Sequence, residues 1–238
     1  MARRRPRPRR GARPGGRSAA RGCGRVTVAL FPLFVELAGR PCVVIGGGAV
    51  AERKVHALLT AGAVVTVVSP ALSPALATLA DAGRIAHVAR LYAEGDLAGA
   101  ALAFAATDDG AVNADVAHEG RMRGVWVNAA DDPPHCDAIL PAVLRRGEIT
   151  VAVSTGGASP ALARAVRERL ERALPPAYAV LARVAADARR ELRAAGRRAS
   201  ADDWLAALDV GLRALLAGAP SVEAARRLRA RLERAECA

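Results

Sequence analysis

The sequence predicts an α/β protein in which a doubly wound parallel sheet is followed by a small α+β region and a helical C-terminal domain. Short apolar segments alternate with helical patterns from residue 43 to residue 127, as expected for a parallel sheet with helices on both faces. Two further apolar runs are joined across a glycine turn, which is typical of a hairpin. Residues 175–238 are mostly Ala, Leu, Arg and Glu at helical spacing, and they predict about three helices.

The first part of the sheet is predicted from a strand–helix–strand unit. An apolar strand over residues 43–45 leads into a helix over residues 50–61, which Gly62 closes as a C-terminal glycine. The second strand covers residues 64–68 and ends at Ser69-Pro70. This spacing suits two parallel strands joined by a crossover helix, so a Rossmann-like fold is the simplest interpretation.

The remaining elements continue the alternation and then depart from it. They are a helix over residues 74–82 ending at Gly83, strands over 85–88 and 102–106, a helix over 111–123 and, after Gly124, a strand over 125–128. After residues 131–134 the pattern changes to strands over 139–143 and 149–153, joined across Arg145-Arg146-Gly147. A helix follows Ser159-Pro160, because Ser is a good N-cap and Pro suits the first helical position.

These changes of pattern divide the chain into four parts. They are an Arg/Pro/Gly-rich leader over residues 1–28, the sheet domain over 29–137, the small α+β region over 138–174 and the helical domain over 175–238, whose helices Gly196, Gly211 and Gly218 separate. The leader has few apolar residues to bury, so we expect it to be disordered. Its ten arginines account for most of the net charge of +12 and leave the rest of the chain close to neutral. The charge therefore does not indicate a nucleic-acid partner.

Cysteine, histidine and hydropathy patterns exclude several classes of protein. The cysteines (Cys23, Cys42, Cys136 and Cys237) are scattered and form no C-x-x-C pair, which argues against a zinc site or a disulfide framework and fits a reducing cytoplasm. The histidines show no metal-ligand spacing, so no resident metal is expected. The chain has no secretory signal and no apolar run of about 18 residues, so we expect a cytoplasmic protein without a membrane partner.

The glycine-rich segment after the first strand is the strongest local signal. Gly46, Gly48 and Ala51 fit the spacing G-x-G-x-x-A, in which the first Gly allows the tight turn and the second lets a pyrophosphate approach the backbone. The N–H groups and the dipole of the following helix would face the phosphates. We therefore predict a dinucleotide site formed by Gly46, Gly47, Gly48, Ala49 and Val50. The alternative is a Gly-rich strand end that binds nothing, which the strand–helix–strand context disfavours.

Polar residues follow two other strands at the sheet edge where ligands of this fold bind. Ser69-Pro70-Ala71 lacks both the acid that favours NAD and the Arg that favours NADP, so these residues leave the choice between them open. Thr107-Asp108-Asp109 follows the strand over 102–106. We expect Thr107 beside the cofactor, and the first interpretation of the two acids is an N-cap for the next helix.

Asp131 and Asp132 stand where the sheet edge meets the second part of the chain, between Asn128 and His135. A carboxylate partly buried beside a nicotinamide can act as a general base, because desolvation raises its pKa. For Asp131 the alternative of equal weight is a turn built on Asp-Pro. His135 is either an assisting residue or a histidine of a surface loop.

A second glycine-rich strand–turn–helix covers residues 154–160. Two glycines and three hydroxyls before a helix N-terminus favour an anion site, suited to a carboxylate or a phosphate. The alternative is a flexible turn before a capped helix. Arg164 and Arg167 lie one and two turns into that helix, which supports a cation near the turn.

Four of these motifs, in this order and spacing, resemble the precorrin-2 dehydrogenase / sirohydrochlorin ferrochelatase family of sirohaem synthesis. They are residues 46–54, residues 106–109 with Asn113, residues 127–128 with Asp131, and residues 154–157 with 159–161. The combination covers roughly residues 31–172 and is far more specific than any single motif. Two features depart from the family: Ala129-Ala130 replace bulkier residues before the Asp, and the helical tail is not recognisable by sequence.

The resemblance implies an NAD-dependent dehydrogenase that oxidises precorrin-2, a tetrapyrrole with many carboxylates, to sirohydrochlorin. It implies that NAD lies on residues 46–50, Ser69, Pro70, Ala71 and Thr107, that Asp131 is the catalytic residue, and that the substrate is bound by Asn128, His135, Ser154, Thr155, Gly156, Gly157 and Ser159. Residues 138–174 would form the interface of a homodimer. In some members of the family the same pocket inserts ferrous iron as a second substrate.

Two other functions stay open at this point. A non-catalytic NAD-sensing dimer would share the first glycine loop but has no need of Asp131 or of the turn at residues 154–160. Nucleic-acid binding depends on the leader alone, so deletion of residues 1–25 without loss of function would discard it. Anaerobic NADH formation with precorrin-2 separates the dehydrogenase from the sensor.

Overall fold

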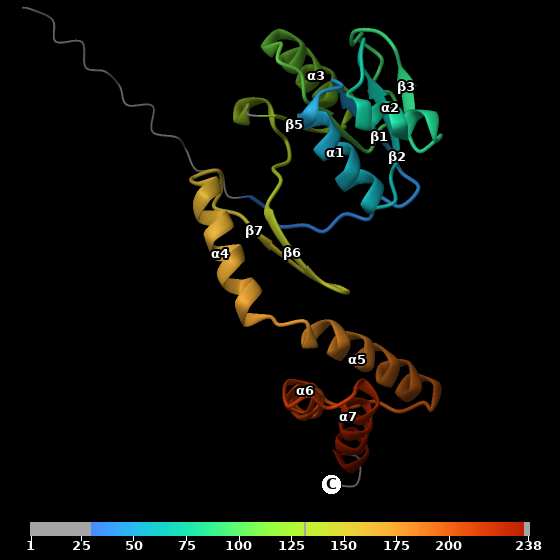
Figure 1. Ribbon diagram of the computed structural model, residues 1–238, viewed down its shortest axis with the longest axis vertical. Coiled ribbons are helices and arrows are strands. Elements are labelled where there is room, and N and C mark those ends of the chain that lie inside the picture. The colour runs from blue at the N-terminus through green and yellow to red at the C-terminus, as the bar shows by residue number, and fades with distance from the viewer. Residues whose placement is uncertain (1–29, 131, 236–238) are drawn as a thin grey trace, which may run out of the picture.

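The computed structural model describes residues 30–130 and 132–235 and arranges them in three parts along one long axis (Figure 1). The predicted leader over residues 1–28 and the predicted catalytic residue Asp131 lie outside the described residues. A sheet domain is followed by a hairpin that packs with one helix, and three helices lie at the far end. Among the described residues, no helix combines the length and the apolar character needed to cross a membrane.

The sheet domain holds five parallel strands in the order β3-β2-β1-β4-β5. They are β1 (Pro41–Ile45), β2 (Val64–Val68), β3 (Ala86–Val88), β4 (Leu102–Ala105) and β5 (Trp126–Ala129). β1 pairs with β2 on one side and with β4 on the other. The strand order therefore reverses direction beside β1, which is the topological switch point of a Rossmann-like sheet, and the predicted fold class is confirmed.

Helices cover both faces of this sheet. α1 (Ala49–Thr60) and α2 (Pro74–Asp81) pack on one face, in a core that includes Val44 and Phe104. α3 (Gly110–Arg123) packs on the other face, in a core that includes Val43 and Ile45. Because consecutive residues of β1 are buried on opposite faces, the strand is apolar throughout rather than alternating.

The middle part consists of the antiparallel strands β6 (Ala142–Arg146) and β7 (Ile149–Val153), on which α4 (Pro160–Ala173) packs. The prediction began the first strand at residue 139 and put Arg145 and Arg146 in the turn, which is wrong. Arg146 pairs with Ile149, so Gly147 and Glu148 alone form the turn, with φ of 57° at Gly147. A two-residue hairpin turn favours positive φ, so Gly147 suits the register in which β6 and β7 pair.

The last part contains the predicted three helices, α5 (Ala177–Ala194), α6 (Ala201–Leu216) and α7 (Ser221–Ala235). Gly196 and Gly218 follow α5 and α6 with φ of 69° and 83°, as expected for glycines that end helices. Gly211 was expected to separate two helices but lies inside α6. A Cβ at Gly211 would come within 3.1 Å of Leu181 Cδ1, so the glycine allows α5 and α6 to pack closely.

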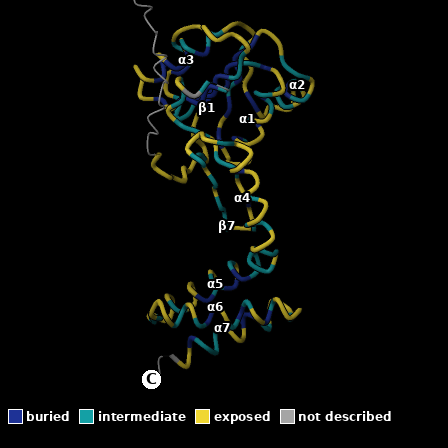
Figure 2. Tube along the Cα trace, turned by 90° about the vertical axis from the view of Figure 1, so that its left-hand side faces the viewer, coloured by how far each residue is buried: buried dark blue, intermediate teal, exposed yellow. Residues whose placement is uncertain are grey.

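Buried residues are concentrated in the sheet domain and among the three C-terminal helices (Figure 2). In β6, β7 and α4, all of whose residues are described, only Leu144 and Ala163 are buried. The middle part therefore has almost no core of its own.

Candidate active site

The glycine loop between β1 and α1 is held from both sides. The Gly46 N–H donates to Val68 O at 2.9 Å, and the Ala106 N–H donates to Ile45 O at 2.8 Å. The Ser73 N–H donates to Gly47 O at 2.8 Å. The loop is thus fixed between the ends of β2 and β4, at the sheet edge where ligands of this fold bind.

The three glycines of this loop meet different requirements. Gly46 has φ of 114°, and a Cβ there would overlap the carbonyl oxygen of Ala106. A Cβ at Gly47 would overlap the carbonyl oxygen of Ala71. At Gly48, the N-cap of α1, a Cβ would meet no described heavy atom within 4 Å. The first turn of α1 therefore opens onto free space, and its N–H groups fit a pyrophosphate.

The end of β2 supports the loop from one side. Ser69 is buried, and its Oγ donates to Ala71 O at 2.7 Å. His87 Nε2 lies 2.9 Å from Ser69 O. Both groups hold residues 69–71 in the conformation that touches the glycine loop, so Ser69 acts on the predicted cofactor site through the backbone.

Thr107 and Asp109 shape the end of β4. The Thr107 hydroxyl donates to Asn113 Oδ1 at 2.9 Å, and Asn113 Nδ2 donates to Thr107 O at 3.1 Å. Asp109 Oδ1 accepts from the N–H groups of Ala111 and Val112 and caps α3. The N-cap interpretation is therefore confirmed for Asp109, whereas the exposed Asp108 is not the cap.

Asn128 is buried on β5, with 8% of its surface exposed, and both ends of its amide have partners. Nδ2 donates to Ala138 O at 2.9 Å, and Oδ1 accepts from Lys54 Nζ at 3.4 Å. Lys54 belongs to α1, and its Nζ lies 5.3 Å from the centre of the Phe104 ring. Sequence reasoning placed Lys54 in the glycine motif but could not find this contact, because the two residues are 74 positions apart.

Residues 132–138 fold back along β5. Asp132 Oδ2 lies 2.6 Å from His135 Nδ1, across the short helix η1 (Pro133–His135). The Cys136 thiol donates to Ala129 O at 3.1 Å. Burial raises the pKa of this thiol, and the carboxylates of Asp132 and Asp137 raise it further. The short helix η1, which carries His135, thus packs against β5, the strand that carries Asn128.

The second glycine turn uses its hydroxyls internally. Ser159 Oγ accepts from the Leu162 N–H at 3.2 Å and caps α4, and Thr155 Oγ1 accepts from the Ser159 N–H at 3.0 Å. Ser154 Oγ accepts from the Gly156 N–H at 3.1 Å. The capped-helix interpretation therefore holds for these side chains. This turn leads from β7 into α4, outside the sheet domain that carries the glycine loop (Figure 1).

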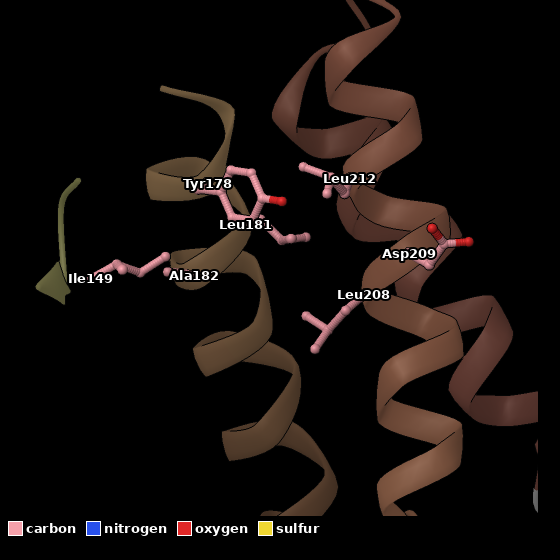
Figure 3. Close-up of a pocket in the computed structure, with 7 residues that line it drawn as sticks. All are labelled: Ile149, Tyr178, Leu181, Ala182, Leu208, Asp209 and Leu212. Atoms are coloured by element: carbon pink, nitrogen blue, oxygen red, sulfur yellow. The ribbon is translucent and has the colours of Figure 1, made fainter. Parts of the chain in front are cut away.

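Two hollows lie outside the sheet domain. One, of about 360 Å³, lies on α4 beside the second glycine turn and is lined by Pro160, Ala161, Arg164, Ala165 and Glu168. It includes Arg164, the cation expected near that turn. The other, of about 370 Å³, lies between β7, α5 and α6 (Figure 3). Its lining of Ile149, Tyr178, Leu181, Ala182, Leu208, Asp209 and Leu212 contains none of the predicted site residues.

A glycine loop at the switch point of a five-stranded parallel sheet, open at the first turn of α1, defines a dinucleotide-binding protein of the Rossmann-like class. A family described as "Putative NAD(P)-binding" matches residues 33–142, and one described as "Sirohaem biosynthesis protein central" matches residues 146–173. Both matches agree with the resemblance of the motifs to the sirohaem biosynthesis family, and the first indicates a cofactor of the NAD(P) type.

Known relatives agree with this assignment. The siroheme synthase of Methylococcus capsulatus is 47% identical over 165 residues, which cover 69% of this chain and 35% of that protein. Siroheme synthase 1 of Serratia proteamaculans is 39% identical over 207 residues, covering 85% of this chain and 43% of that one. The solved structure of SirC, a precorrin-2 dehydrogenase, matches with a TM-score of 0.61 and 26% identity over 76% of this chain and 88% of SirC. The chain thus spans less than half the length of the two siroheme synthases.

Proposed function

We propose that the protein oxidises precorrin-2 to sirohydrochlorin in sirohaem biosynthesis. The observation that carries the proposal is the open first turn of α1 behind Gly48, at the same sheet edge as the residues that follow β5. The likeness to a precorrin-2 dehydrogenase supports the choice of substrate. NAD, when bound, supplies the acceptor for the hydride that the tetrapyrrole loses.

The cofactor would be held chiefly by backbone. The N–H groups of residues 48–50 face the space behind Gly48, where they would donate to the pyrophosphate. We assign Ser69, Pro70 and Ala71 to the cofactor site on the β2 side and Thr107 on the β4 side, because they follow the two strands that flank β1. The hydrogen bonds that hold the glycine loop between these strands would help to fix the position of a bound cofactor.

We infer that Asp131 accepts the proton that precorrin-2 releases. Its chain neighbour Ala130 is fixed beside β4, since the Ala130 N–H donates to Ala105 O at 2.8 Å. Asp131→Ala should abolish turnover and leave NAD affinity unchanged. The control Asp108→Ala removes an exposed acid that follows the neighbouring strand β4, and it should retain turnover. Full activity of Asp131→Ala would refute the base role.

The substrate carboxylates call for donors and cations. We assign them to Asn128 and His135 at the sheet edge and to the turn formed by Ser154, Thr155, Gly156, Gly157 and Ser159. Arg164 in the hollow beside this turn supports the assignment, because guanidinium groups bind carboxylates with two parallel hydrogen bonds. In the turn, the Ser154 and Ser159 hydroxyls accept in these bonds and can still donate their protons to a carboxylate, whereas the N–H groups of Gly156 and Ser159 already have partners.

We propose further that the protein is a homodimer joined through residues 138–174, the part between the sheet domain (29–137) and the helical domain (175–238). That part buries only two of the residues of β6, β7 and α4. It also exposes large apolar side chains, with Leu140 at 51% and Leu162 at 54%. Surfaces of this kind are typical of interfaces between subunits.

Iron insertion into sirohydrochlorin is a second activity, favoured by the Asp132–His135 pair at the sheet edge. A carboxylate and an imidazole 2.6 Å apart can take up the protons that a metal displaces from pyrrole nitrogens. No group of three or more His, Cys, Asp or Glu among the described residues could hold a metal, so ferrous iron is treated as a substrate. A rate of insertion equal to that without protein would rule the activity out.

We assign the protein to the cytoplasm, because its scattered cysteines favour a reducing compartment. The rival function, an NAD-sensing module, requires NAD binding but no turnover. NADH formation from precorrin-2 under anaerobic conditions distinguishes the two, and NAD binding without it would favour the sensor.

A further inference from the structure

The side chain of Lys54 is partly buried, unlike that of the preceding residue, Arg53. It extends from the middle of α1, the helix that carries both residues. The Lys54 ammonium lies over the Phe104 ring of β4 and against Asn128 of β5. A lysine on a surface helix normally keeps its ammonium in water, so these contacts have to offset a cost of desolvation. The ring face and the amide oxygen do so.

The contact with Lys54 determines how the Asn128 amide is oriented. An ammonium group only donates hydrogen bonds, so the amide must present its oxygen to Lys54 and its nitrogen elsewhere. The nitrogen then donates to Ala138 O at 2.9 Å. A reversed amide would set its NH₂ group against the ammonium and lose both hydrogen bonds.

Asn128 in turn holds the segment that returns along β5. Besides the bond to Ala138, its Nδ2 lies 3.7 Å from Cys136 Sγ, and the Asp137 N–H donates to Val127 O at 2.8 Å. Residues 132–138 begin one position after the proposed base and carry the Asp132–His135 pair. The conformation of this segment therefore sets the border of the proposed substrate site.

We infer that Lys54 is a positioning residue: it orients the Asn128 amide and thereby fixes residues 132–138 at the sheet edge, without touching the substrate. The inference rests on the proposed dehydrogenase function for its effect on turnover. Its structural part, the link from Lys54 to the returning segment, does not depend on that function.

The kinetic test compares Lys54→Met, Lys54→Arg and the exposed control Arg53→Met. We expect Lys54→Met to lower kcat with precorrin-2 by roughly tenfold to a hundredfold, because small displacements of a site cost rates of this order. The NAD affinity, the midpoint of thermal unfolding and the KM for NAD should stay close to those of Arg53→Met. Lys54→Arg, which keeps a charged donor, should recover most of the loss. Equal kcat values for Lys54→Met and Arg53→Met would overturn the inference.

The structural test measures alkylation of Cys136 by iodoacetamide in a Cys23→Ser/Cys237→Ser background, where the other thiol, Cys42, is 1% exposed. The charge of Lys54 lowers the pKa of the Cys136 thiol, so its loss alone would slow alkylation. If Lys54→Met instead releases residues 132–138, alkylation becomes several times faster than in Arg53→Met. An unchanged or slower rate contradicts the link. Faster alkylation in a protein that forms no NADH from precorrin-2 would uphold the link and reject the proposed function.

Discussion

At the scale of single residues, Gly47 is required by the packing of the loop, whereas Gly48 is required only by the proposed cofactor. A Cβ at Gly47 would overlap a backbone carbonyl, whereas a Cβ at Gly48 would point into open space. We therefore expect Gly47→Ala to cost about 1–3 kcal/mol in the free energy of unfolding, as for other overpacked sites. Gly48→Ala should leave thermal stability unchanged. Chemical denaturation of the two variants measures the difference, and equal losses would contradict the geometry.

Gly48→Asp tests the cofactor site itself. A carboxylate at this position would occupy the space in front of α1 and repel the pyrophosphate. Because like charges across a binding site cost several kcal/mol, NAD affinity should fall by roughly a hundredfold or more while the protein stays folded. Isothermal titration calorimetry measures the dissociation constant, and Gly48→Ala, which adds bulk without charge, should weaken NAD binding less than Gly48→Asp does. If Gly48→Asp bound NAD as tightly as the unchanged protein, the assignment of the cofactor site to this loop would be wrong.

Glu119 is a buried acid whose stabilising effect depends on pH. It is 4% exposed and accepts hydrogen bonds from the Tyr92 hydroxyl at 2.5 Å, the Gly95 N–H at 3.0 Å and Arg123 Nε at 2.6 Å. Burial alone would raise the pKa of Glu119, but these donors hold it below its ordinary value. The carboxylate therefore stabilises the fold above the ordinary carboxyl pKa, and this contribution is lost as the pH falls through the lowered value.

Glu119→Gln keeps the shape of the side chain and removes its charge. We expect a loss of about 1.5–3 kcal/mol at neutral pH, the range for hydrogen bonds to a charged group. The difference from the unchanged protein should shrink on acidification below the ordinary carboxyl pKa. Urea unfolding at neutral and acidic pH measures it, and a difference that is constant with pH would contradict a role for the charge.

At the scale of the elements, a comparison of two N-cap serines distinguishes an effect on stability from an effect on substrate binding. Ser159 and Ser200 both accept from the N–H of the third helical residue, at 3.2 Å in α4 and 3.1 Å in α6. Replacement of either by Ala should cost about 1 kcal/mol of stability. Ser159→Ala should also raise the KM for precorrin-2, whereas Ser200→Ala should not, because only Ser159 belongs to the proposed substrate turn. Equal KM values for Ser159→Ala and Ser200→Ala would mean that Ser159 is a helix cap without a role in substrate binding.

Local chemistry explains which elements the sequence predicts well. The predicted start of α4 at Ser159-Pro160 agrees with the structure within one or two residues. So do the predicted bounds of α1, α2 and α3, which end at glycines, since caps and glycines act on their immediate neighbours. The hairpin turn fails because two arginines say nothing about register, which β6 and β7 determine by pairing. Gly211 fails for a related reason: only the approach of α5 shows why a glycine lies inside α6.

In the candidate site too, contacts between contiguous residues are predictable from the sequence, whereas contacts between distant residues are not. The glycine loop and the cap at Asp109 are predictable because their residues are contiguous. The link from Lys54 to Asn128 and the buried network of Glu119 join segments far apart in the chain. Their signals in the sequence are a lysine inside the glycine motif and a glutamate on the face of α3 that also buries Val116 and Gly120. Neither signal names the partner.

At the scale of the whole molecule, the sparse core of the middle part leads to a test of the dimer. The chain has a mass of 24.6 kDa, and light scattering should give twice that value. Leu162→Glu places a charge on the exposed apolar face of α4 and should shift the protein toward the monomer. Val222→Glu, at a still more exposed position on α7, should leave the dimer intact. A monomeric mass for the unchanged protein would contradict the proposed interface.

The most direct measurement of the central proposal is anaerobic incubation of the protein with precorrin-2 and NAD, followed through NADH absorbance and the appearance of sirohydrochlorin. We expect NADH and sirohydrochlorin to form in equal amounts, and neither to form with Asp131→Ala. Tight NAD binding with no NADH above the rate without protein would contradict it.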